Sequence, residues 1–279
     1  MSENAMVAEM SSRLKELETW FRQWNSALVA YSGGVDSALT MTVAHRALGD
    51  RALACIAVSP SFPEREKRDA LELADRLGLA VRQIETNELK DANYRENNRS
   101  RCYFCKSEVY GRMREVAAAE GWQVLIDGTN EDDLGDDRPG QYAGREQRVR
   151  SPLVELNVSK EEVRALAKEL DLPVWDKPAM ACLASRVPRG TAVTPELLKQ
   201  IEQAEDVLVE LGFSQYRVRH HGSIARIELG EDELEKALDH RERIIEGIQA
   251  AGYEHVCLDL AGYRTGSVSP DDDGTEGDD

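Results

Sequence analysis

A short polar stretch has the residue types of a phosphate-binding loop, and it consists of Ser32, Gly33, Gly34, Val35, Asp36 and Ser37. It follows an apolar strand pattern that ends at Tyr31, and a helix pattern opens near Ser37. Glycines let the backbone approach a ligand closely, and the free N–H groups at the start of a helix attract an anion. The serine hydroxyls add donors to phosphate oxygens, and Asp36 is suited either to position Mg²⁺ or to orient the loop. Because the Gly-Lys-Ser ending of a Walker loop is absent, transfer of a γ-phosphoryl group is not the expected chemistry.

A second polar stretch follows the apolar residues 122–126, and it consists of Asp127, Gly128, Thr129 and Asn130. The carboxyl ends of parallel strands meet at one edge of a sheet, where ligands bind. We therefore expect this stretch to form a second ligand-facing loop beside the first. A simple polar turn is the alternative interpretation.

Three cysteines lie at sites where a thiol could react. Cys102 and Cys105 form a Cys-x-x-Cys pair ahead of a predicted helix, and Cys182 lies in an irregular stretch, residues 175–190. The thiolate is the form that attacks carbon or binds a metal. A structural zinc site would need a fourth ligand, for which His220 or His221 would serve. A dithiol redox pair would leave Cys182 unused, whereas a 4Fe-4S cluster with one open iron for external sulfide would use all three.

The elements that must position these residues alternate along the first part of the chain. Apolar strand patterns are separated by helix patterns and occupy residues 27–31, 52–58, 80–84 and 122–126. Helices are expected from near Ser37, over residues 63–77, and from about Lys106 to Ala119. This alternation predicts an α/β fold with a parallel, doubly wound sheet covered by helices on both faces. No periodicity is visible over residues 128–151, which we expect to be irregular.

The order of elements changes after Thr194. A helix is followed by strands at residues 215–220 and 224–228, a further helix, and a strand at residues 255–260. We predict a first domain over residues 1–184 and a smaller α+β domain over residues 185–268. Residues 269–279 carry no apolar side chain and should form a disordered acidic tail. Arg217 and Arg219 alternate along one strand, so both face one side, where guanidinium groups suit a phosphate.

The charge balance limits the partners of this protein. The chain has 279 residues with 35 basic and 52 acidic side chains, and its formal net charge is −17. The average surface therefore repels nucleic acid and anionic lipid. Arginine outnumbers lysine, and carboxylates outnumber basic side chains. This composition is explained either by adaptation to a salt-rich cytoplasm or by the base composition of the genome.

Apolar runs, the start of the chain and the cysteine count indicate the cellular compartment. No apolar run approaches the length of a membrane span, and the polar start does not resemble a signal peptide. We therefore expect a cytoplasmic protein that binds no membrane. Five cysteines, an odd number, make a disulfide framework unexpected. Cys55 and Cys257 lie within apolar strand patterns, so we expect both to be small packed side chains.

The stretch SGGVDS resembles the pyrophosphate loop of the PP-loop ATP-pyrophosphatase superfamily. Three further stretches, KPAMACLASRVPRG, YRVRHHGSIARIEL and LDLAGYRTG, extend the resemblance over about residues 10–268 to the LarE family within it. These ATP-dependent sacrificial sulfur transferases have an adenine nucleotide alpha hydrolase-like sheet and use ATP and Mg²⁺. They adenylylate carboxylates of pyridinium-3,5-biscarboxylic acid mononucleotide and convert them to thiocarboxylates. The product leads to the nickel-pincer nucleotide cofactor of lactate racemase.

The resemblance assigns roles to residues of this chain. It implies that ATP binds to residues 32–37 and 127–130, and that Asp36 is catalytic. Binding of the mononucleotide substrate is implied for Ser185, Arg186, Arg217 and Arg219, and Glu205 is a further candidate for the same site.

The source of sulfur stays open between two branches of the family. One branch sacrifices a single cysteine and leaves dehydroalanine, whereas the other has three cysteines and is thought to hold a cluster that delivers sulfide. Cys102, Cys105 and Cys182 match the second branch. The resemblance therefore implies delivery either by sulfide on a 4Fe-4S cluster bound to these three residues or by Cys182 itself.

Two other functions remain as alternatives. A PP-loop tRNA thiolase also uses Cys-x-x-Cys and clusters, but the net charge and the lack of a lysine-rich or zinc-ribbon RNA module disfavour it. A protein that senses ATP or redox state through its thiols, without turnover, is the other alternative. The resemblance further implies a homo-oligomer and handover of the product to other enzymes of nickel-pincer cofactor biosynthesis.

Overall fold

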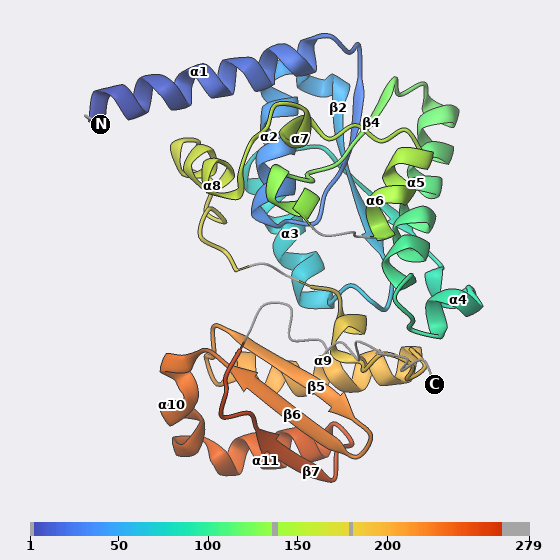
Figure 1. Ribbon diagram of the computed structural model, residues 1–279, viewed down its shortest axis with the longest axis vertical. Helices are drawn as coiled ribbons and strands as arrows, with labels where there is room; N and C mark the ends of the chain where they lie inside the picture. The colour runs from blue at the N-terminus through green and yellow to red at the C-terminus, as the bar shows by residue number, and fades with distance from the viewer. Residues whose placement is uncertain (1–2, 136–138, 179–180, 264–279) are drawn as a thin grey trace, which may run out of the picture. The chain divides into compact units, whose positions relative to one another are not determined.

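The computed structural model describes residues 3–135, 139–178 and 181–263 (Figure 1). The predicted acidic tail at residues 269–279 lies outside the described residues. The chain divides into two compact units, one made of Met1–Tyr94 with Arg99–Met180 and the other of Arg95–Asn98 with Ala181–Asp279. The domain boundary between residues 184 and 185 stays a prediction.

A four-stranded parallel sheet, in the order β3-β2-β1-β4, forms the centre of the first unit. Its strands are β1 (Ala27–Ala30), β2 (Ala52–Val58), β3 (Val81–Glu85) and β4 (Val124–Ile126). Val29 of β1 lies in register with Ala54 of β2 and with Ile126 of β4. The parallel pairing confirms the predicted α/β sheet, and it directs all four carboxyl ends to one edge.

Helices cover both faces of this sheet (Figure 1). The helices of the first unit are α1 (Glu3–Arg22), α2 (Val35–Leu48), α3 (Glu64–Arg76), α4 (Ala92–Arg95), α5 (Arg101–Glu120), α6 (Pro139–Glu146), α7 (Pro152–Glu155) and α8 (Lys160–Glu169). Val29 and Ile126 belong to a core shared with α1, α2, α3 and α8, whereas Leu28 and Leu125 belong to a second core shared with α5 and α6. This division follows from the alternation of side chains along a strand.

Two helices of the first unit differ from the sequence prediction. Helix α5 begins at Arg101 instead of near Lys106, so Cys102 and Cys105 lie inside the helix as its second and fifth residues. Helix α6 occupies part of the stretch that was expected to be irregular. Proline at the first position of α6 has a φ angle that is already helical. The helix is too short for its apolar periodicity to be visible, since only Gly140 and Ala143 are buried.

The second unit contains a three-stranded sheet in the order β5-β6-β7. Strand β5 (Tyr216–His221) is antiparallel to β6 (Ile224–Leu229), and β7 (His255–Leu258) is parallel to β6. The helices are α9 (Pro195–Glu210), α10 (Leu234–Asp239) and α11 (Arg241–Ala250). Val218 and Ile227, which lie opposite each other, pack into a core with α9 and α11. Arg217 and Arg219 therefore point to the other face of the sheet, as the alternation predicts.

The two cysteines expected to be packed side chains differ. Cys55 is 2% exposed in the core beneath α5 and α6, and this burial raises the pKa of its thiol to about 12. Cys257 is exposed, so its predicted burial is wrong. Strand β7 is an edge strand on which exposed and half-buried side chains alternate, and Cys257 lies on the exposed side. Among the helices of the described residues, none is long and apolar enough to cross a membrane.

Candidate functional site

The hydroxyl of Ser37 closes the phosphate loop between β1 and α2. Its Oγ accepts a hydrogen bond from the backbone N–H of Ser32 (3.1 Å) and donates one to the carbonyl oxygen of Gly34 (3.0 Å). The Oγ atoms of Ser32 and Ser37 lie 3.2 Å apart. Ser37 is 7% exposed, whereas Ser32 is exposed. Ser37 therefore stabilises the conformation of the loop, whereas Ser32 lies at the surface of the loop.

Gly33 is required by both the conformation and the packing of this loop. Its φ angle is +74°, and a Cβ atom added to it would lie 2.6 Å from the Cβ atom of Ala70 on α3. Any other residue would be strained and would push the loop away from α3. The N-cap of α2 is Gly34, which has no side chain over the first free N–H groups of the helix. An anion at this helix end meets unshielded donors.

Asp36 is bound by a cation and by an amide. Its Oδ2 accepts from the Nζ atom of Lys160 (2.5 Å), and its Oδ1 accepts from Nδ2 of Asn130 (3.1 Å). Lys160 is the first residue of α8, whose start is fixed by a capping box between Ser159 and Glu162. Two helix starts, those of α2 and α8, therefore meet at the Asp36–Lys160 ion pair, and each places a positive dipole end there.

The loop of residues 127–130 touches the phosphate loop directly. A Cβ atom added to Gly128 would lie 2.9 Å from the backbone nitrogen of Ser37, so only glycine allows this approach. Asn130 is 3% exposed, and its Oδ1 atom has no hydrogen-bond partner among the described residues. The structure thus brings together the two loops that the sequence predicted to share one site.

Asp127 organises the second loop. Its carboxylate accepts hydrogen bonds from the hydroxyls of Tyr110 (2.8 Å), Thr129 (2.9 Å) and Ser151 (2.6 Å), and from the backbone N–H of Thr129 (3.2 Å). Burial, together with the charge of Asp127 and the hydrogen bond to it, raises the pKa of Tyr110 well above its ordinary value. Tyr110 therefore stays a neutral donor.

The three predicted cysteine ligands are divided between the units. Cys102 is exposed and Cys105 is half-buried near the start of α5, in the first unit. Cys182 is half-buried in the second unit. Within the described residues, no three His, Cys, Asp or Glu side chains form a group that could hold a metal ion. Neither unit by itself supplies three thiolates to a cluster.

Cys182 is the N-cap of a single 3₁₀ turn, Leu183–Arg186. We call residues 181–186 the Cys182 turn. Arg186 is 4% exposed and binds Glu205 of α9 through Nε (2.8 Å) and Nη2 (3.0 Å). Burial alone would lower the pKa of Arg186, but the charge and hydrogen bonds of Glu205, with a smaller effect from Cys182, raise it. Arg186 is therefore a permanent cation beneath the turn.

Arg219 is held in the same way by Glu228. Its Nε lies 3.1 Å from both carboxylate oxygens, and its Nη2 lies 3.0 Å from Oε2. Glu228 is 1% exposed and also accepts from Nη2 of Arg226 (2.9 Å). The structure brings Arg186 and Arg219 to one place, as predicted, but each is engaged by a buried carboxylate.

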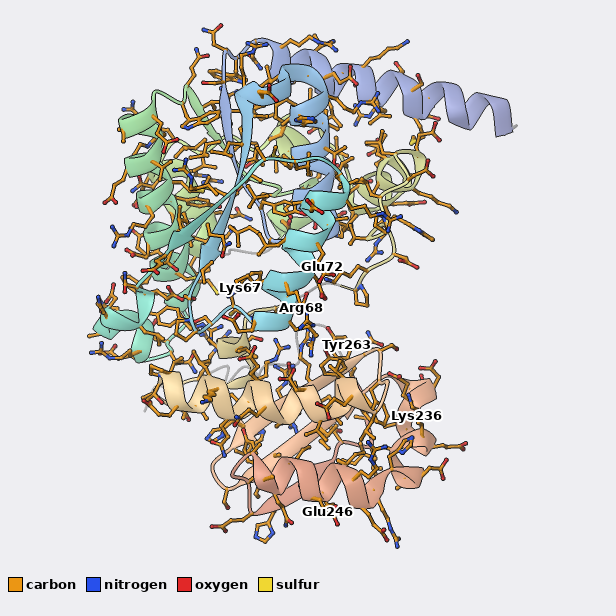
Figure 2. All side chains as sticks on the ribbon, turned by 180° about the vertical axis from the view of Figure 1, so that it is seen from behind. Lys67, Arg68, Glu72, Lys236, Glu246 and Tyr263 are labelled. Atoms are coloured by element: carbon orange, nitrogen blue, oxygen red, sulfur yellow. The ribbon has the colours of Figure 1, made fainter. Side chains whose placement is uncertain are left out.

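Arg217 has a different environment from the other two arginines. Its guanidinium lies 5.0 Å from the centre of the Tyr263 ring and donates to the hydroxyl of Tyr263 (3.1 Å); Figure 2 labels Tyr263. Burial and the nearby Arg186, with Arg219 adding less, lower the pKa of Arg217, although Tyr263 and Glu205 partly oppose them. Cationic charge is crowded at this position, and a bound anion would relieve it.

Several residues of these sites were not predicted from the sequence. Lys160 lies 124 positions from Asp36, and the Ser159–Glu162 capping pattern indicates the helix start without indicating what the lysine contacts. No sequence motif indicates a role for Tyr110, Ser151 or Glu228.

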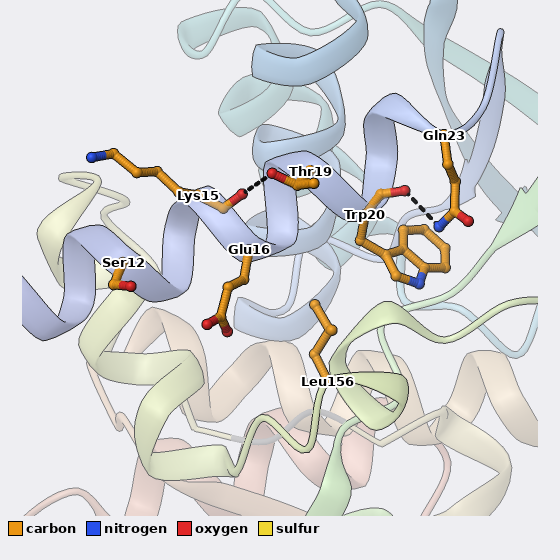
Figure 3. A pocket seen from close by; sticks show the side chains of 7 residues that line it. All are labelled: Ser12, Lys15, Glu16, Thr19, Trp20, Gln23 and Leu156. Carbon is orange, nitrogen blue, oxygen red and sulfur yellow. Dashed lines mark hydrogen bonds between the residues drawn. The ribbon is translucent and has the colours of Figure 1, made fainter.

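A cavity of about 600 Å³ lies elsewhere in the first unit, along α1 (Figure 3), and is lined by Ser12, Lys15, Glu16, Thr19, Trp20, Gln23 and Leu156. Two of these polar side chains donate hydrogen bonds to the backbone of α1. Thr19 donates to the carbonyl of Lys15 (2.7 Å), and Gln23 donates to the carbonyl of Trp20 (2.8 Å). The cavity includes none of the predicted site residues.

Comparison with known proteins connects this geometry to a family. Residues 9–134 match the NAD synthase family. A pyridinium-3,5-bisthiocarboxylic acid mononucleotide synthase from Lactiplantibacillus plantarum is 36% identical over 94% of this chain and 96% of its own. Uncharacterized proteins from Synechocystis sp. and Methanocaldococcus jannaschii are 43% and 30% identical, over 93% and 85% of this chain and 98% and 90% of theirs.

These matches differ in how much of the chain they cover. The NAD synthase match spans α1 to β4 and includes both loops of the phosphate site. The similarity to the Lactiplantibacillus plantarum synthase continues through the Cys182 turn and the second sheet, because it covers 94% of this chain. Identity of 36% along nearly the whole of both chains indicates common descent, and the chain therefore belongs to the LarE family of the PP-loop ATP-pyrophosphatase superfamily.

Proposed function

We propose that this protein is an ATP-dependent sulfur transferase that adenylylates carboxylates of pyridinium-3,5-biscarboxylic acid mononucleotide and converts them to thiocarboxylates. The product would serve the nickel-pincer nucleotide cofactor of lactate racemase. The observation that carries the proposal is the 36% identity, over 94% of this chain, to a synthase named for the bisthiocarboxylic acid mononucleotide. The oligomeric state and the handover to later enzymes stay predictions.

The phosphate site supports the activation step. A carboxylate is a poor electrophile, because its leaving group would be oxide. Attack of a carboxylate oxygen on the α-phosphorus of ATP forms an acyl adenylate and expels pyrophosphate. The free N–H groups of α2 and the hydroxyl of Ser32 would receive the pyrophosphate oxygens, and the ammonium of Lys160 would offset their charge.

The residues near Asp36 also fit Mg²⁺. This ion prefers oxygen ligands and is bound through one or two carboxylates together with substrate phosphates. Asp36 supplies a carboxylate, and the unpartnered, buried Oδ1 of Asn130 supplies an amide oxygen next to it. When bound with ATP, Mg²⁺ would neutralise phosphate charge. Lys160 occupies Oδ2 of Asp36 in this structure, so we expect its ammonium to turn to the phosphates when the ion binds.

The sulfur step follows activation. Cys182 thiolate would attack the acyl carbon, AMP would leave, and the resulting thioester would join Cys182 to the substrate. Elimination across the Cα–Cβ bond of Cys182 would then release the thiocarboxylate and leave dehydroalanine in the chain. Sulfide on a cluster is the other proposed source. We derive no step through that cluster, because its three predicted ligands do not lie in one unit.

The substrate has a phosphate of its own, for which Arg217 is the proposed partner. Its guanidinium is half-buried, and this burial, together with the neighbouring arginines, lowers its pKa. A dianionic phosphate would be stabilised by charge-assisted hydrogen bonds there. The aromatic face of Tyr263 already supports the guanidinium plane.

The test uses full-length protein purified without oxygen. It is incubated with ATP, Mg²⁺ and pyridinium-3,5-biscarboxylic acid mononucleotide, and pyrophosphate, AMP and thiocarboxylate are measured. We expect pyrophosphate release that depends on the carboxylate substrate. Iron content and the intact mass of the protein before and after turnover separate the two sulfur sources. ATP binding without any substrate-dependent release would contradict the proposal and favour a sensor, and release that depends on tRNA would favour a thiolase.

A further inference from the structure

The Cys182 turn has little internal structure to hold its cysteine. Its 3₁₀ segment, Leu183–Arg186, is one turn long, and the N–H of Ser185 donates to the carbonyl of Cys182 (2.9 Å). A single turn closed in this way is marginal in water, because several dihedral angles are fixed for one hydrogen bond. The orientation of Cys182 must therefore depend on contacts made from outside the turn.

The side chain of Arg186, the last residue of the turn, makes the first connection to the structure outside it. Its Nη1 atom donates to the carbonyl oxygens of Ala181 (2.7 Å) and Cys182 (3.2 Å) and to Oγ of Ser185 (3.0 Å). The other two nitrogens of the same guanidinium bind Glu205. One planar group thus joins three residues of the turn to helix α9.

Glu205 fixes this guanidinium in position. It is 2% exposed, and besides Arg186 it accepts from the backbone N–H of Val218 on β5 (3.0 Å). The carboxylate is therefore anchored by both a helix and a strand. A bidentate arginine–carboxylate pair has a defined plane, so the position of α9 against β5 determines where the carbonyl of Cys182 points.

Arg219, on strand β5, supplies a second contact to the turn. Its Nη1 atom donates to the carbonyl oxygen of Ser185 (2.8 Å), while its Nε and Nη2 bind Glu228. The register places Arg219 opposite Arg226 on β6, so this contact is set by strand pairing and not by a loop. Two arginines on different elements therefore hold the two ends of the Cys182 turn.

We propose that Arg186 and Arg219, each locked by a buried carboxylate, are positioning residues that orient Cys182. Each guanidinium has all three of its nitrogens engaged by a carboxylate and by the turn. This inference rests on the proposed function for its catalytic meaning, but its structural content does not.

The burial of these two ion pairs indicates that they fix the conformation of the Cys182 turn. A buried ion pair often contributes little net stability compared with apolar packing, since desolvation offsets the attraction. Two such pairs lie beneath a single turn, and the side chains of Arg186 and Glu205 are 4% and 3% exposed. Their fixed fork geometry restrains the turn to one conformation, which apolar side chains would not do.

The test separates the two steps of the reaction in Arg186→Lys and Arg219→Lys. Lysine keeps the positive charge beside the carboxylate but cannot also reach the carbonyls of the turn with a second arm. We expect substrate-dependent pyrophosphate release to stay near the wild-type rate and formation of thiocarboxylate to fall by about 100-fold, the effect of misplacing a reacting atom by roughly 1 Å. Arg226→Lys is the matched control, because Arg226 binds the same Glu228 and otherwise Asp259.

A second readout needs no turnover. Alkylation of Cys182 by iodoacetamide is followed by peptide mass spectrometry, with the exposed Cys257 as the reference thiol in the same molecule. Loss of one charge-assisted hydrogen bond should free the turn and raise the relative rate at Cys182 roughly tenfold in both lysine variants. The rate in Arg226→Lys should match that of the wild type.

Equal alkylation of Cys182 in all four proteins, with equal thiocarboxylate formation, would overturn the inference. Loss of pyrophosphate release together with thiocarboxylate would also overturn it, since substrate binding would then be affected. If a lysine variant unfolds, seen by circular dichroism, Glu205→Gln replaces it, because glutamine keeps the shape and removes the charge. If the wild type forms no thiocarboxylate, the proposed function fails, and the alkylation rates still decide whether the turn is held in this way.

Discussion

The two carboxylates of the phosphate site differ in what they can still bind. Asp127 receives four hydrogen bonds from three residues, which is the full capacity of a carboxylate. Asp36 receives one hydrogen bond from the amide of Asn130 and one from the ammonium of Lys160. An ammonium is exchangeable for another cation, whereas four hydroxyl and amide donors are not. Asp36 is therefore the carboxylate that is open to a ligand, and Asp127 shapes the loop beside it.

Removal of the charge of Lys160 should slow the first chemical step. In Lys160→Gln the pyrophosphate leaving group loses a cation at the start of α8, and we expect its release to fall by about 100-fold, as for other groups that stabilise developing charge. The measurement is the rate of pyrophosphate release with saturating ATP and carboxylate substrate.

Lys168→Gln is the control for that variant. Lys168 lies on the same helix and contacts the ring of Trp175 (4.7 Å) instead of Asp36. It removes an equal charge from the same helix, so its rate should stay near that of the wild type. Equal rates in the two variants would show that Lys160 has no part in the reaction.

Asp127→Asn should weaken the second loop, because the carboxylate of Asp127 holds this loop by four hydrogen bonds. The amide nitrogen would face hydroxyl or N–H donors, so at least one buried hydrogen bond is lost. We expect the free energy of unfolding to fall by about 1–3 kcal/mol and the KM for ATP to rise. Tyr110→Phe, which removes one of the four donors, should have a smaller effect. Urea unfolding and ATP titration of both variants check this, and a larger loss in Tyr110→Phe would contradict it.

The roles of some of these residues could be predicted from the sequence, and those of others could not. The residues 32–37 and 127–130 stand in local patterns that indicate a loop at a strand end, and the structure brings the two loops into contact. Lys160 and Glu228 act through partners that are far apart in the chain or on a neighbouring strand. No local pattern records such a pairing, because it arises only when the helices and strands pack.

Helices and strands give the phosphate site its rigidity through close backbone contacts. Gly33 brings the first loop against α3, and Gly128 brings the second loop against the start of α2. Each contact leaves no room for a Cβ atom, so the two loops and two helices are fixed relative to one another. The site is thereby built before any ligand binds, which lowers the entropy lost on binding.

Prediction from the sequence was accurate for long apolar elements and poor for short or edge elements. The four strands of the first sheet were visible because buried parallel strands are continuous apolar runs. Helix α6 was missed because eight residues with two buried side chains show no periodicity. Cys257 was misplaced because an edge strand can be apolar in composition and still expose one side. The divalent and cluster sites depend on tertiary positions that periodicity does not encode.

Strand β5 should make stability depend on pH near neutrality. Partial burial, with a smaller effect of His221, lowers the pKa of His220 from its ordinary 6.5. The folded protein then binds fewer protons than the unfolded chain below pH 6.5, so stability is constant above that pH and falls as the pH decreases through it. Urea unfolding at pH 7.5 and 5.5 should show this loss, and His220→Gln should show less of it. An equal loss in both proteins would assign the effect to other groups.

The charge of the whole molecule acts against the compact state. The net charge is −17, and six of the acids lie in residues 271–279. Many of the described ion pairs are exposed, such as Arg22 with Glu18 and Arg82 with Glu120, and such pairs contribute little to stability because water and salt screen them. Cations at the Cys182 turn are paired internally and do not offset the surface. Repulsion between unpaired surface carboxylates is therefore the larger long-range electrostatic effect.

Salt should stabilise this protein more than it weakens its ion pairs. Raising NaCl from 0.1 to 1 M shortens the Debye length from about 10 Å to about 3 Å, which screens repulsion between surface carboxylates. We expect the midpoint of thermal unfolding to rise by roughly 4 °C, which corresponds to about 1 kcal/mol for a chain of this size. KCl should act equally, because screening does not depend on the identity of the cation. A midpoint that stays constant or falls in both salts would mean that surface ion pairs outweigh the repulsion, and that the acidic composition does not reflect a salt-rich cytoplasm.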